Sequence, residues 1–473
     1  MGGSATVDFV TRGSRWLRIY RWPRTASRRG LSRVRVWMPL RFSDLVSGSL
    51  ETPTPAELDK AHLWHPFTPM TEWCAESHEP LFIERGEGVY LWDVEGNRYL
   101  DGNSTIWTNL HGHRHPTIDA ALRGQLERIA HVSALGFANE PAAHLAAALV
   151  GQFPPESLTR VFLSDDGSTA IECACKMAQQ YFQLTGQAGR NRFISFDGAY
   201  HGDTAGAASL GGIDAFHQRF RRDGFDVEIV PDLAGLDGLA HEDFAAVIIE
   251  PLIQGAAGMR TWPKGMLREL RIWCDAHGVL LILDEVMTGF GRTGTMFACQ
   301  QEDVIPDFLC LAKGLTGGYL PLAATLTTER VFDAFLGDVS RAFYYGHSYC
   351  ANPLGCAAAL GSLQVFEEER VIESLPEKIE ALRESLDRHF PATDRRISGV
   401  RQVGLIAGID LVNPESSQRL GSEVCFAARQ YGLLTRPVRD TLVFMPPLAI
   451  TPHEIETGVK ALSRALTDVL EKS

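Results

Sequence analysis

Six short apolar runs in the middle of the chain place the strongest limit on how it can fold. They lie near residues 161, 193, 246, 280, 309 and 322, and helical patterns or long crossovers separate them. The run Val279–Leu283 is apolar and rich in branched side chains, which is typical of a parallel strand buried on both faces. Strands that alternate with helices form a mostly parallel, doubly wound sheet with helices on both faces. The sequence therefore predicts an α/β fold.

Two charged residues follow two of these runs. Asp284 ends the run that starts at Val279, and Lys313 follows the run Phe308–Ala312 and precedes a glycine-rich turn. Ligands of open α/β sheets usually bind at the carboxyl ends of the strands. Alone, the lysine could be a rim residue, and the aspartate could be a helix cap or a metal ligand. Together they suit pyridoxal phosphate (PLP), which forms a Schiff base with a lysine and whose pyridinium nitrogen an aspartate keeps protonated.

The segment SDDGSTAIE, residues 164–172, predicts a strand, a turn and a helix with an anion site at the turn. Gly167 and Ser168 stand at the start of the predicted helix. Free backbone N–H groups and the helix dipole favour a phosphate there, and a glycine allows its close approach. The serine and aspartates before Gly167 could instead simply cap the helix, and both interpretations can hold.

Two further side chains follow predicted strands. Tyr200 lies in the glycine-flanked segment DGAYHGDT, where it could stack on a planar ring, although tyrosines are more often core or surface residues. Arg436 precedes Pro437 at a predicted strand end, where it could hold an acidic or polar substrate or be a surface arginine. Three histidines, at 111, 113 and 115, favour loop packing or substrate lining over zinc, because no cysteine stands close by.

Composition excludes several classes of function. The 473 residues suggest two or three domains, and the net charge of −13 argues against nucleic acid as the main partner. The nine cysteines form no CxxC pair, which indicates reduced thiols in a cytosol rather than a disulfide framework. An apolar run of about 18 residues, as a membrane span needs, is not found in the sequence.

The first fifty residues differ in composition from the rest. Ten arginines and no acidic residue lie between Thr11 and Arg41. We favour an over-extended start, with translation beginning near Met38, or a disordered basic arm. An organellar transit peptide is the alternative, because such peptides are rich in arginine and poor in acids.

The remaining chain divides into three predicted parts. Residues 51–115 form a segment of a smaller domain, 116–370 a large cofactor-binding domain, and 371–473 a C-terminal α+β domain, after a basic extension over 1–50. Alternating runs in 81–101 predict a small antiparallel meander. In the C-terminal part we expect a helix from about Pro376 to His389 and a strand over Val400–Asp410.

From about His62 to Lys472 the chain resembles the class III, fold-type I, PLP-dependent aminotransferases. The motifs that carry the resemblance are LILDEVMTGFGRTG, AKGLTGG, SDDGSTAIE, GAYHGD and EPLIQGAAGM, and together they are highly specific. The segments HLWHPFTPM, HGHRHP, TRP and MPP are similar to the branch of this family that aminates 8-amino-7-oxononanoate in biotin synthesis. The usual amino donor in that branch is S-adenosylmethionine. The resemblance implies a homodimer with shared sites, in the cytoplasm, and a small domain built from both chain ends.

The resemblance also implies roles for individual residues. Lys313 is the Schiff-base lysine, Asp284 the partner of the pyridinium, and Tyr200 the stacking residue, with Asp203 nearby. The other expected roles are phosphate binding by Gly167 and Ser168, phosphate binding from the second subunit by Ser348, and substrate binding by Trp107, Gly346 and Arg436. Arg292 stands at the arginine of the GFGRTG segment.

Two departures from the family pattern leave the amino donor open. Users of S-adenosylmethionine usually have HPY and a Trp–Trp pair, whereas this chain has Phe67 and Ile106–Trp107. Losing a hydroxyl and an indole can redirect specificity, and the same changes resemble a lysine-using variant. The rival interpretations are a different ω-aminotransferase of the class, and a PLP-binding protein kept for regulation or assembly.

Overall fold

The computed structural model describes residues 7–11, 16–20, 53–413 and 419–472. Most of the predicted basic extension, residues 1–50, lies outside this described part. The chain divides into two compact units, residues 1–81 and 82–473. Because this division does not test the predicted domain bounds at 115/116 and 370/371, those bounds stay predictions.

The described residues of the first unit form two strands and two short helices. β1 (Val7–Thr11) pairs antiparallel with β2 (Trp16–Tyr20). α2 (Pro55–His62) starts at a capping box, in which Glu57 N donates to Thr54 Oγ1 at 3.2 Å and Thr54 N donates to Glu57 Oε2 at 2.8 Å. This reciprocal pair satisfies two N–H groups that a helix start leaves free.

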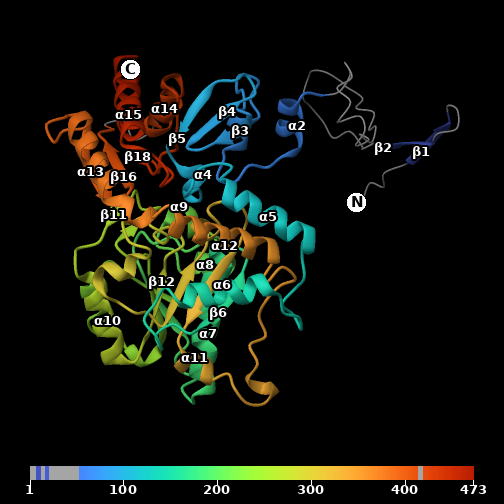
Figure 1. Cartoon of the computed structure of the whole chain (residues 1–473), viewed down its shortest axis with the longest axis vertical. Coiled ribbons are helices and arrows are strands. Elements are labelled where there is room, and N and C mark those ends of the chain that lie inside the picture. The colour runs from blue at the N-terminus through green and yellow to red at the C-terminus, as the bar shows by residue number, and fades with distance from the viewer. Residues whose placement is uncertain (1–6, 12–15, 21–52, 414–418, 473) are drawn as a thin grey trace, which may run out of the picture. The chain divides into compact units, whose positions relative to one another are not determined.

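A seven-stranded sheet forms the centre of the second unit (Figure 1). The strand order is β6-β14-β13-β12-β9-β7-β8, and β14 alone runs antiparallel to its neighbours. The strands are β6 (Arg160–Ser164), β7 (Arg192–Phe196), β8 (Val227–Val230), β9 (Phe244–Ile249), β12 (Leu280–Asp284), β13 (Phe308–Leu311) and β14 (Ala323–Thr327). Six of them match the predicted runs, and β8 was not predicted.

Burial of both sheet faces explains why the strands are apolar throughout. Every residue of β12 is buried, with Leu281 and Leu283 in the core on one face and Leu280 and Ile282 in the core on the other. α7 (Gly167–Leu184) contacts β9, β13 and β14 and contributes to the second core. The other core takes side chains from α10 (Met266–His277) and α12 (Pro353–Glu368).

The described part of the chain contains further helices, of which α3 belongs to the first unit and the others to the second. They are α3 (Met70–Trp73), α4 (Ser104–Trp107), α5 (Pro116–Arg128), α6 (Glu140–Val150), α8 (Ala205–Ser209), α9 (Asp214–His217), α11 (Glu329–Asp333), α13 (Val371–His389), α14 (Leu420–Ala427) and α15 (Pro452–Lys472). In the described part of the chain, no helix combines the length and apolarity that crossing a bilayer demands.

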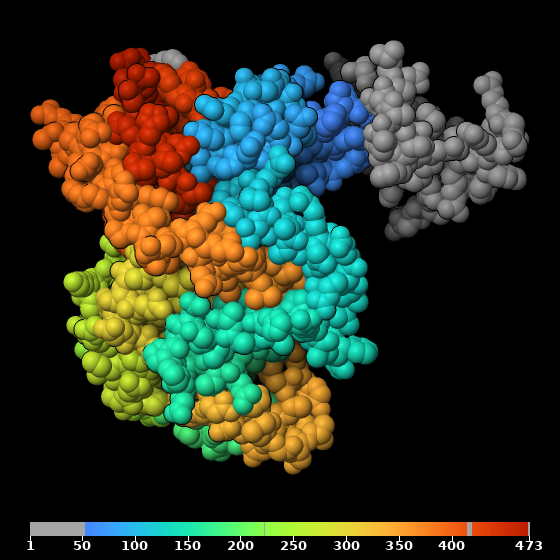
Figure 2. Space-filling view, viewed as in Figure 1, coloured from blue at the N-terminus to red at the C-terminus, as the bar shows by residue number. Residues whose placement is uncertain are grey.

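The start and the end of the second unit meet in one small sheet. β3 (Ile83–Glu87), β4 (Tyr90–Asp93) and β5 (Arg98–Asp101) form the predicted antiparallel meander, and β17 (Leu433–Leu434) adds to β5 in parallel. Figure 2 shows the light-blue surface of the meander adjoining the red C-terminal segment. This pairing agrees with the expectation that both ends of the chain build the smaller α+β part.

Two expectations for the C-terminal part were wrong in detail. The predicted strand Val400–Asp410 is a hairpin of β15 (Ile397–Val403) and β16 (Ile406–Leu411), which continues to β18 (Thr441–Phe444). Gly404 turns the chain with φ +57°, and a Cβ there would lie 2.2 Å from Arg292 O, so only glycine fits. α13 begins at Val371, and Pro376 lies inside the helix rather than at its start.

Candidate active site

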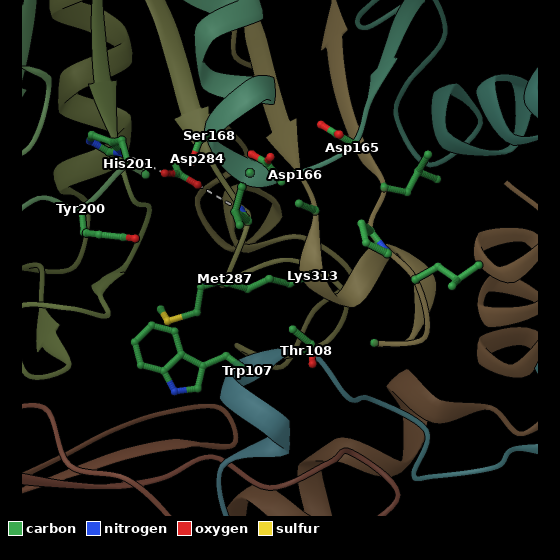
Figure 3. A pocket seen from close by; sticks show the side chains of 18 of the residues that line it. Trp107, Thr108, Asp165, Asp166, Ser168, Tyr200, His201, Asp284, Met287 and Lys313 are labelled. Carbon is green, nitrogen blue, oxygen red and sulfur yellow. Dashed lines mark hydrogen bonds and ion pairs between the residues drawn. The ribbon is translucent and has the colours of Figure 1, made fainter. Parts of the chain in front are cut away.

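Five of the six predicted cofactor-binding residues line one cavity at the carboxyl end of the sheet, and Ser348 is the exception. The cavity has a volume of about 460 Å³ and is lined from the start of α7, the segments after β7, β9, β12 and β13, and the end of α4. Figure 3 shows Asp284, Lys313, Tyr200, Ser168 and Trp107 around it. The site lies where ligands of doubly wound sheets bind, outside the strand ends.

Asp284 is fixed by a histidine. The Asp284 carboxylate is 5% exposed, and His201 Nδ1 lies 2.7 Å from Asp284 Oδ2. Because an ionised carboxylate only accepts hydrogen bonds, His201 Nδ1 carries the hydrogen. Val286 N donates to the other oxygen at 3.1 Å. The two bonds hold a charged acceptor in place at the cavity, where it can pair with a protonated ring nitrogen.

Lys313 is a buried amine. It begins the turn Lys313–Thr316 directly after β13, with a left-handed φ of +42°. Burial lowers the pKa of the Lys313 amine, although Asp284 and Glu250 act in the opposite direction. The amine therefore releases its proton more readily than an exposed lysine does, which suits a nucleophile and a base.

The N-terminus of α7 forms, with Gly202, a cradle that suits an anion. Asp166 caps the helix, and its Oδ1 accepts from Thr169 N at 2.9 Å, which leaves the first N–H groups of the helix for a ligand. A Cβ on Gly202 would lie 2.1 Å from Ser168 Oγ, so two backbones approach closely here. The predicted cap is therefore present at Asp166, and phosphate binding by Gly167 and Ser168 stays a prediction.

Tyr200 lines the cavity from the segment after β7, with hydrogen bonds to both its backbone and its hydroxyl. Its hydroxyl donates to Asp203 Oδ2 at 2.6 Å, and its backbone N–H donates to Glu250 Oε2 at 3.2 Å. Burial, and then the bond to Asp203, raise the pKa of the Tyr200 hydroxyl, so it stays protonated at neutral pH. Burial also raises the pKa of Glu250 to about 7.

Trp107 lines another side of the cavity and belongs to a strained turn. The four residues Ser104–Trp107 all have left-handed φ, between +48° and +69°, and none of them is glycine. Such a conformation costs about 1–2 kcal/mol for each residue. The centre of the Trp107 ring lies 4.9 Å from Lys313 Nζ, which is within the range of a cation–π contact.

The structure brings six of the nine predicted site residues together and leaves three apart. Lys313, Asp284, Tyr200, Gly167, Ser168 and Trp107 line the cavity. Ser348, Gly346 and Arg436 are exposed and are not among its lining residues in the described part of the chain. Ser348 was expected to act in the site of a second subunit, so its position here does not test that role.

Arg292 and three other residues complete the surroundings. Arg292 is 1% exposed and donates to Asn109 O and Pro446 O, and burial lowers its pKa to about 9. The cavity is also lined by His201, Glu250 and Val286, which were not predicted from the sequence. His201 directly follows Tyr200, Glu250 directly follows a predicted strand, and Val286 lies two residues after Asp284, so their positions in the sequence were the available signal.

Comparison with known proteins identifies the family. A family model described as aminotransferase class-III matches residues 73–466. The chain belongs to the class-III aminotransferases. It is 47% identical over 448 residues to the adenosylmethionine-8-amino-7-oxononanoate aminotransferase of Nitratidesulfovibrio vulgaris Hildenborough, over 88% of this chain and 82% of that protein. These matches confirm the resemblance seen in the sequence.

Solved structures of class-III aminotransferases and related transaminases confirm the fold. The enzyme of the same name from Methanocaldococcus jannaschii superimposes with a TM-score of 0.83 at 40% identity, over 87% of this chain and 98% of that one. An amine transaminase from an uncultivated Pseudomonas species, solved in its PLP-bound form, gives 0.79 at 34% identity, over 86% and 98% of the two chains. The predicted α/β architecture of fold type I is therefore correct.

The cavity of this class-III aminotransferase fits PLP, the cofactor on which the family depends. The cradle of Gly167, Ser168 and Gly202 suits a phosphate, because a helix start favours an anion. A Cβ would lie 2.8 Å from Val286 Cγ1 at Gly167 and 2.1 Å from Ser168 Oγ at Gly202, so only glycine fits at either position. The Asp284 carboxylate suits a pyridinium nitrogen, and the buried Lys313 amine suits the aldehyde.

Proposed function

We propose that this class-III aminotransferase moves an amino group from S-adenosylmethionine to 8-amino-7-oxononanoate, which yields 7,8-diaminononanoate for biotin biosynthesis. One observation carries the proposal: Lys313, Asp284 and the start of α7 meet in a single cavity. They do so in a chain that is 47% identical to an enzyme named for this donor and this acceptor.

PLP, when bound, supplies an electron sink that stabilises negative charge on the carbon carrying the amino group. Lys313 is the proposed general base and acid. Its amine, with a pKa lowered by burial, takes the proton from that carbon of the donor. In the second half-reaction the same amine returns a proton to the carbon that was the ketone of the acceptor.

The other residues are proposed to bind and orient the cofactor and the substrates. Asp284, held by His201, is the proposed partner of the ring nitrogen, and the α7 cradle is the proposed phosphate site. Tyr200 is the proposed stacking residue, and Trp107 and Tyr200 border the space for substrates. For Arg436 and Gly346 the proposed role is substrate binding, in accord with their places in the family motifs.

Both half-reactions use one cavity, so donor and acceptor must enter in turn. The keto product of the donor leaves before 8-amino-7-oxononanoate binds. This order gives ping-pong kinetics, with parallel lines in double-reciprocal plots.

The test is to mix the purified PLP form with S-adenosylmethionine, and separately with lysine, and to follow the cofactor absorbance. We expect bleaching with S-adenosylmethionine, which would mean that Phe67 and Ile106 are tolerated in a user of the usual donor. Bleaching with lysine alone would assign those two positions to a lysine-using variant. If neither bleaches the cofactor and another amino acid does, the biotin assignment fails and a different ω-aminotransferase replaces it.

A homodimer that shares its active sites is also proposed. The exposed positions of Ser348 and Gly346, away from the cavity of their own chain, support a role in the site of a second copy. Large apolar side chains are exposed in the same region, namely Leu336, Val339, Tyr344 and Tyr349. A second subunit covering them would remove this apolar surface from water.

The proposed location is the cytoplasm. All nine cysteines are free in the structure, and eight of them are buried. Free thiols agree with a reducing compartment.

A further inference from the structure

The strained turn Ser104–Trp107 needs an anchor at each end. Four consecutive left-handed residues without a glycine persist only where the surroundings determine them, and such strain concentrates at functional sites. At the start of the turn, Ser104 Oγ donates to Met445 O at 2.7 Å and Thr105 N donates to Asp101 Oδ1 at 3.0 Å. These bonds fix the beginning of the turn but not the indole at its end.

The indole has its own anchor, the side chain of Asn103. Trp107 Nε1 donates to Asn103 Oδ1 at 2.8 Å. Asn103 is 6% exposed, so little water reaches this acceptor. An indole can only donate, and an apolar residue at position 103 would therefore leave the N–H without this acceptor.

The anchored indole faces the reactive amine. Its ring centre lies 4.9 Å from Lys313 Nζ, and it packs with Met287 in a small apolar cluster. A Cβ on Gly255 would lie 3.1 Å from Trp107 Cζ3, so the ring is also confined from behind. Figure 3 shows the Trp107 ring and Met287 beside Lys313, so the position of the ring limits the space next to the amine.

We propose that Asn103 is a positioning residue of the substrate site: its amide oxygen holds the Trp107 indole against the Lys313 amine. Asn103 is not among the residues that line the cavity, so its proposed effect on the site passes through Trp107. For the activity readouts, this inference rests on the proposed aminotransferase function. The hydrogen bond itself can be tested without that function.

The first experiment uses apoenzyme labelled with ¹⁵N-tryptophan. The indole signal that is missing from Trp107→Phe identifies Trp107, and its N–H exchange with deuterated water is then measured. We expect exchange to become at least about tenfold faster in Asn103→Ala, because opening of a hydrogen-bonded site controls exchange. The exposed Asn191→Ala is the matched control and should leave the rate unchanged. An unchanged rate in Asn103→Ala overturns the proposal.

The second experiment is a double-mutant cycle in the donor half-reaction. Asn103→Ala should lower kcat/KM about tenfold to a hundredfold, the range for leaving a buried donor unsatisfied. In the Trp107→Phe background, which lacks the indole N–H, the same change should cost less than about twofold. Equal losses in both backgrounds would mean that Asn103 acts independently of Trp107, and the proposal would fail. The wild type could react with no amino donor while the Trp107 N–H still exchanges faster in Asn103→Ala. In that case the proposed function fails and the proposed role of Asn103 stands.

Discussion

The hydroxyl of Tyr200 donates a hydrogen bond of 2.6 Å to Asp203 Oδ2. The carboxylate of Asp203 is half exposed, whereas the tyrosine ring borders the cavity, so the bond ties the ring to the rim of the site. Ser168 Oγ accepts from Asp203 N at 3.2 Å, which connects the same rim to the anion cradle. One aspartate therefore connects the proposed stacking residue with the proposed phosphate site.

Replacing Asp203 with Asn should weaken both half-reactions. The amide oxygen is a poorer acceptor than a carboxylate, and a bond to a charged group contributes about 1.5–3 kcal/mol. We expect kcat/KM to fall at least about tenfold, measured from the rate of cofactor bleaching. In a Tyr200→Phe background, Asp203→Asn should add little, because the donor is already absent. A full additional loss there would show that Asp203 acts by another route.

Replacing His201 with Ala should lower the affinity for PLP. Asp284 would lose its 2.7 Å donor while remaining buried, and the loss of a bond to a charged group corresponds to about a tenfold to hundredfold weaker affinity. The measurement is the dissociation constant of PLP from absorbance titration of the apoenzyme. His201→Asn should recover part of the affinity, since its amide N–H can donate from nearly the same place as Nδ1. The exposed His144→Ala is the control and should bind PLP normally.

Replacing Lys313 with Ala should abolish steady-state turnover. The variant lacks both the covalent anchor for PLP and the proposed proton carrier. It should still fold, because the change removes an amine whose burial is unfavourable. The measurements are turnover and the unfolding midpoint. Appreciable turnover in a folded variant would contradict the role given to Lys313.

The sequence pattern was sufficient for the sheet and for the residues at its strand ends. Asp284 and Lys313 could be predicted because each directly follows an apolar run, and the end of such a strand faces the ligand edge. β8 was missed because its four residues include Glu228, which breaks the apolar run. Gly404 was missed because its turn depends on the close approach of Arg292 O, a contact between residues far apart in the chain.

Other features of the site depend on tertiary contacts and could not be predicted from the sequence pattern. Nothing local predicts a left-handed turn over Ser104–Trp107, since it contains no glycine or asparagine. The pairing of His201 with Asp284 joins residues from different strand ends. The places of Ser348, Gly346 and Arg436 depend on the arrangement of further segments or a further subunit, so their roles stay predictions.

Glu285 should make stability depend on pH in the neutral range. It is fully buried and accepts from Ala298 N at 2.6 Å and Cys299 N at 2.8 Å, and burial raises its pKa from 4.5 to about 7. A raised pKa in the folded state means that its stabilising effect is complete below pH 4.5 and is lost as pH rises through 7.

The matched variant is Glu285→Gln, which has no charge to titrate. The unfolding free energy of the wild type minus that of the variant should fall by about 3 kcal/mol between pH 4.5 and pH 8. Urea unfolding of the apoenzymes at several pH values, at one protein concentration, gives this difference. A difference that stays flat or rises with pH would contradict the raised pKa.

A chain with a changed Ser348 and a chain with a changed Lys313 should complement each other in the proposed dimer. Lys313→Ala removes the reactive amine, and Ser348→Glu places a negative charge where the phosphate of PLP is proposed to bind. Each variant alone should be inactive. In a mixed dimer, the Ser348→Glu chain keeps its Lys313. Its site receives Ser348 from the Lys313→Ala chain, where that serine is unchanged. Random pairing makes half of the dimers mixed, with one working site each, so co-expression should restore about one quarter of wild-type activity. If the co-expressed chains form dimers but stay inactive, the site belongs to a single chain, and Ser348 does not act across the interface.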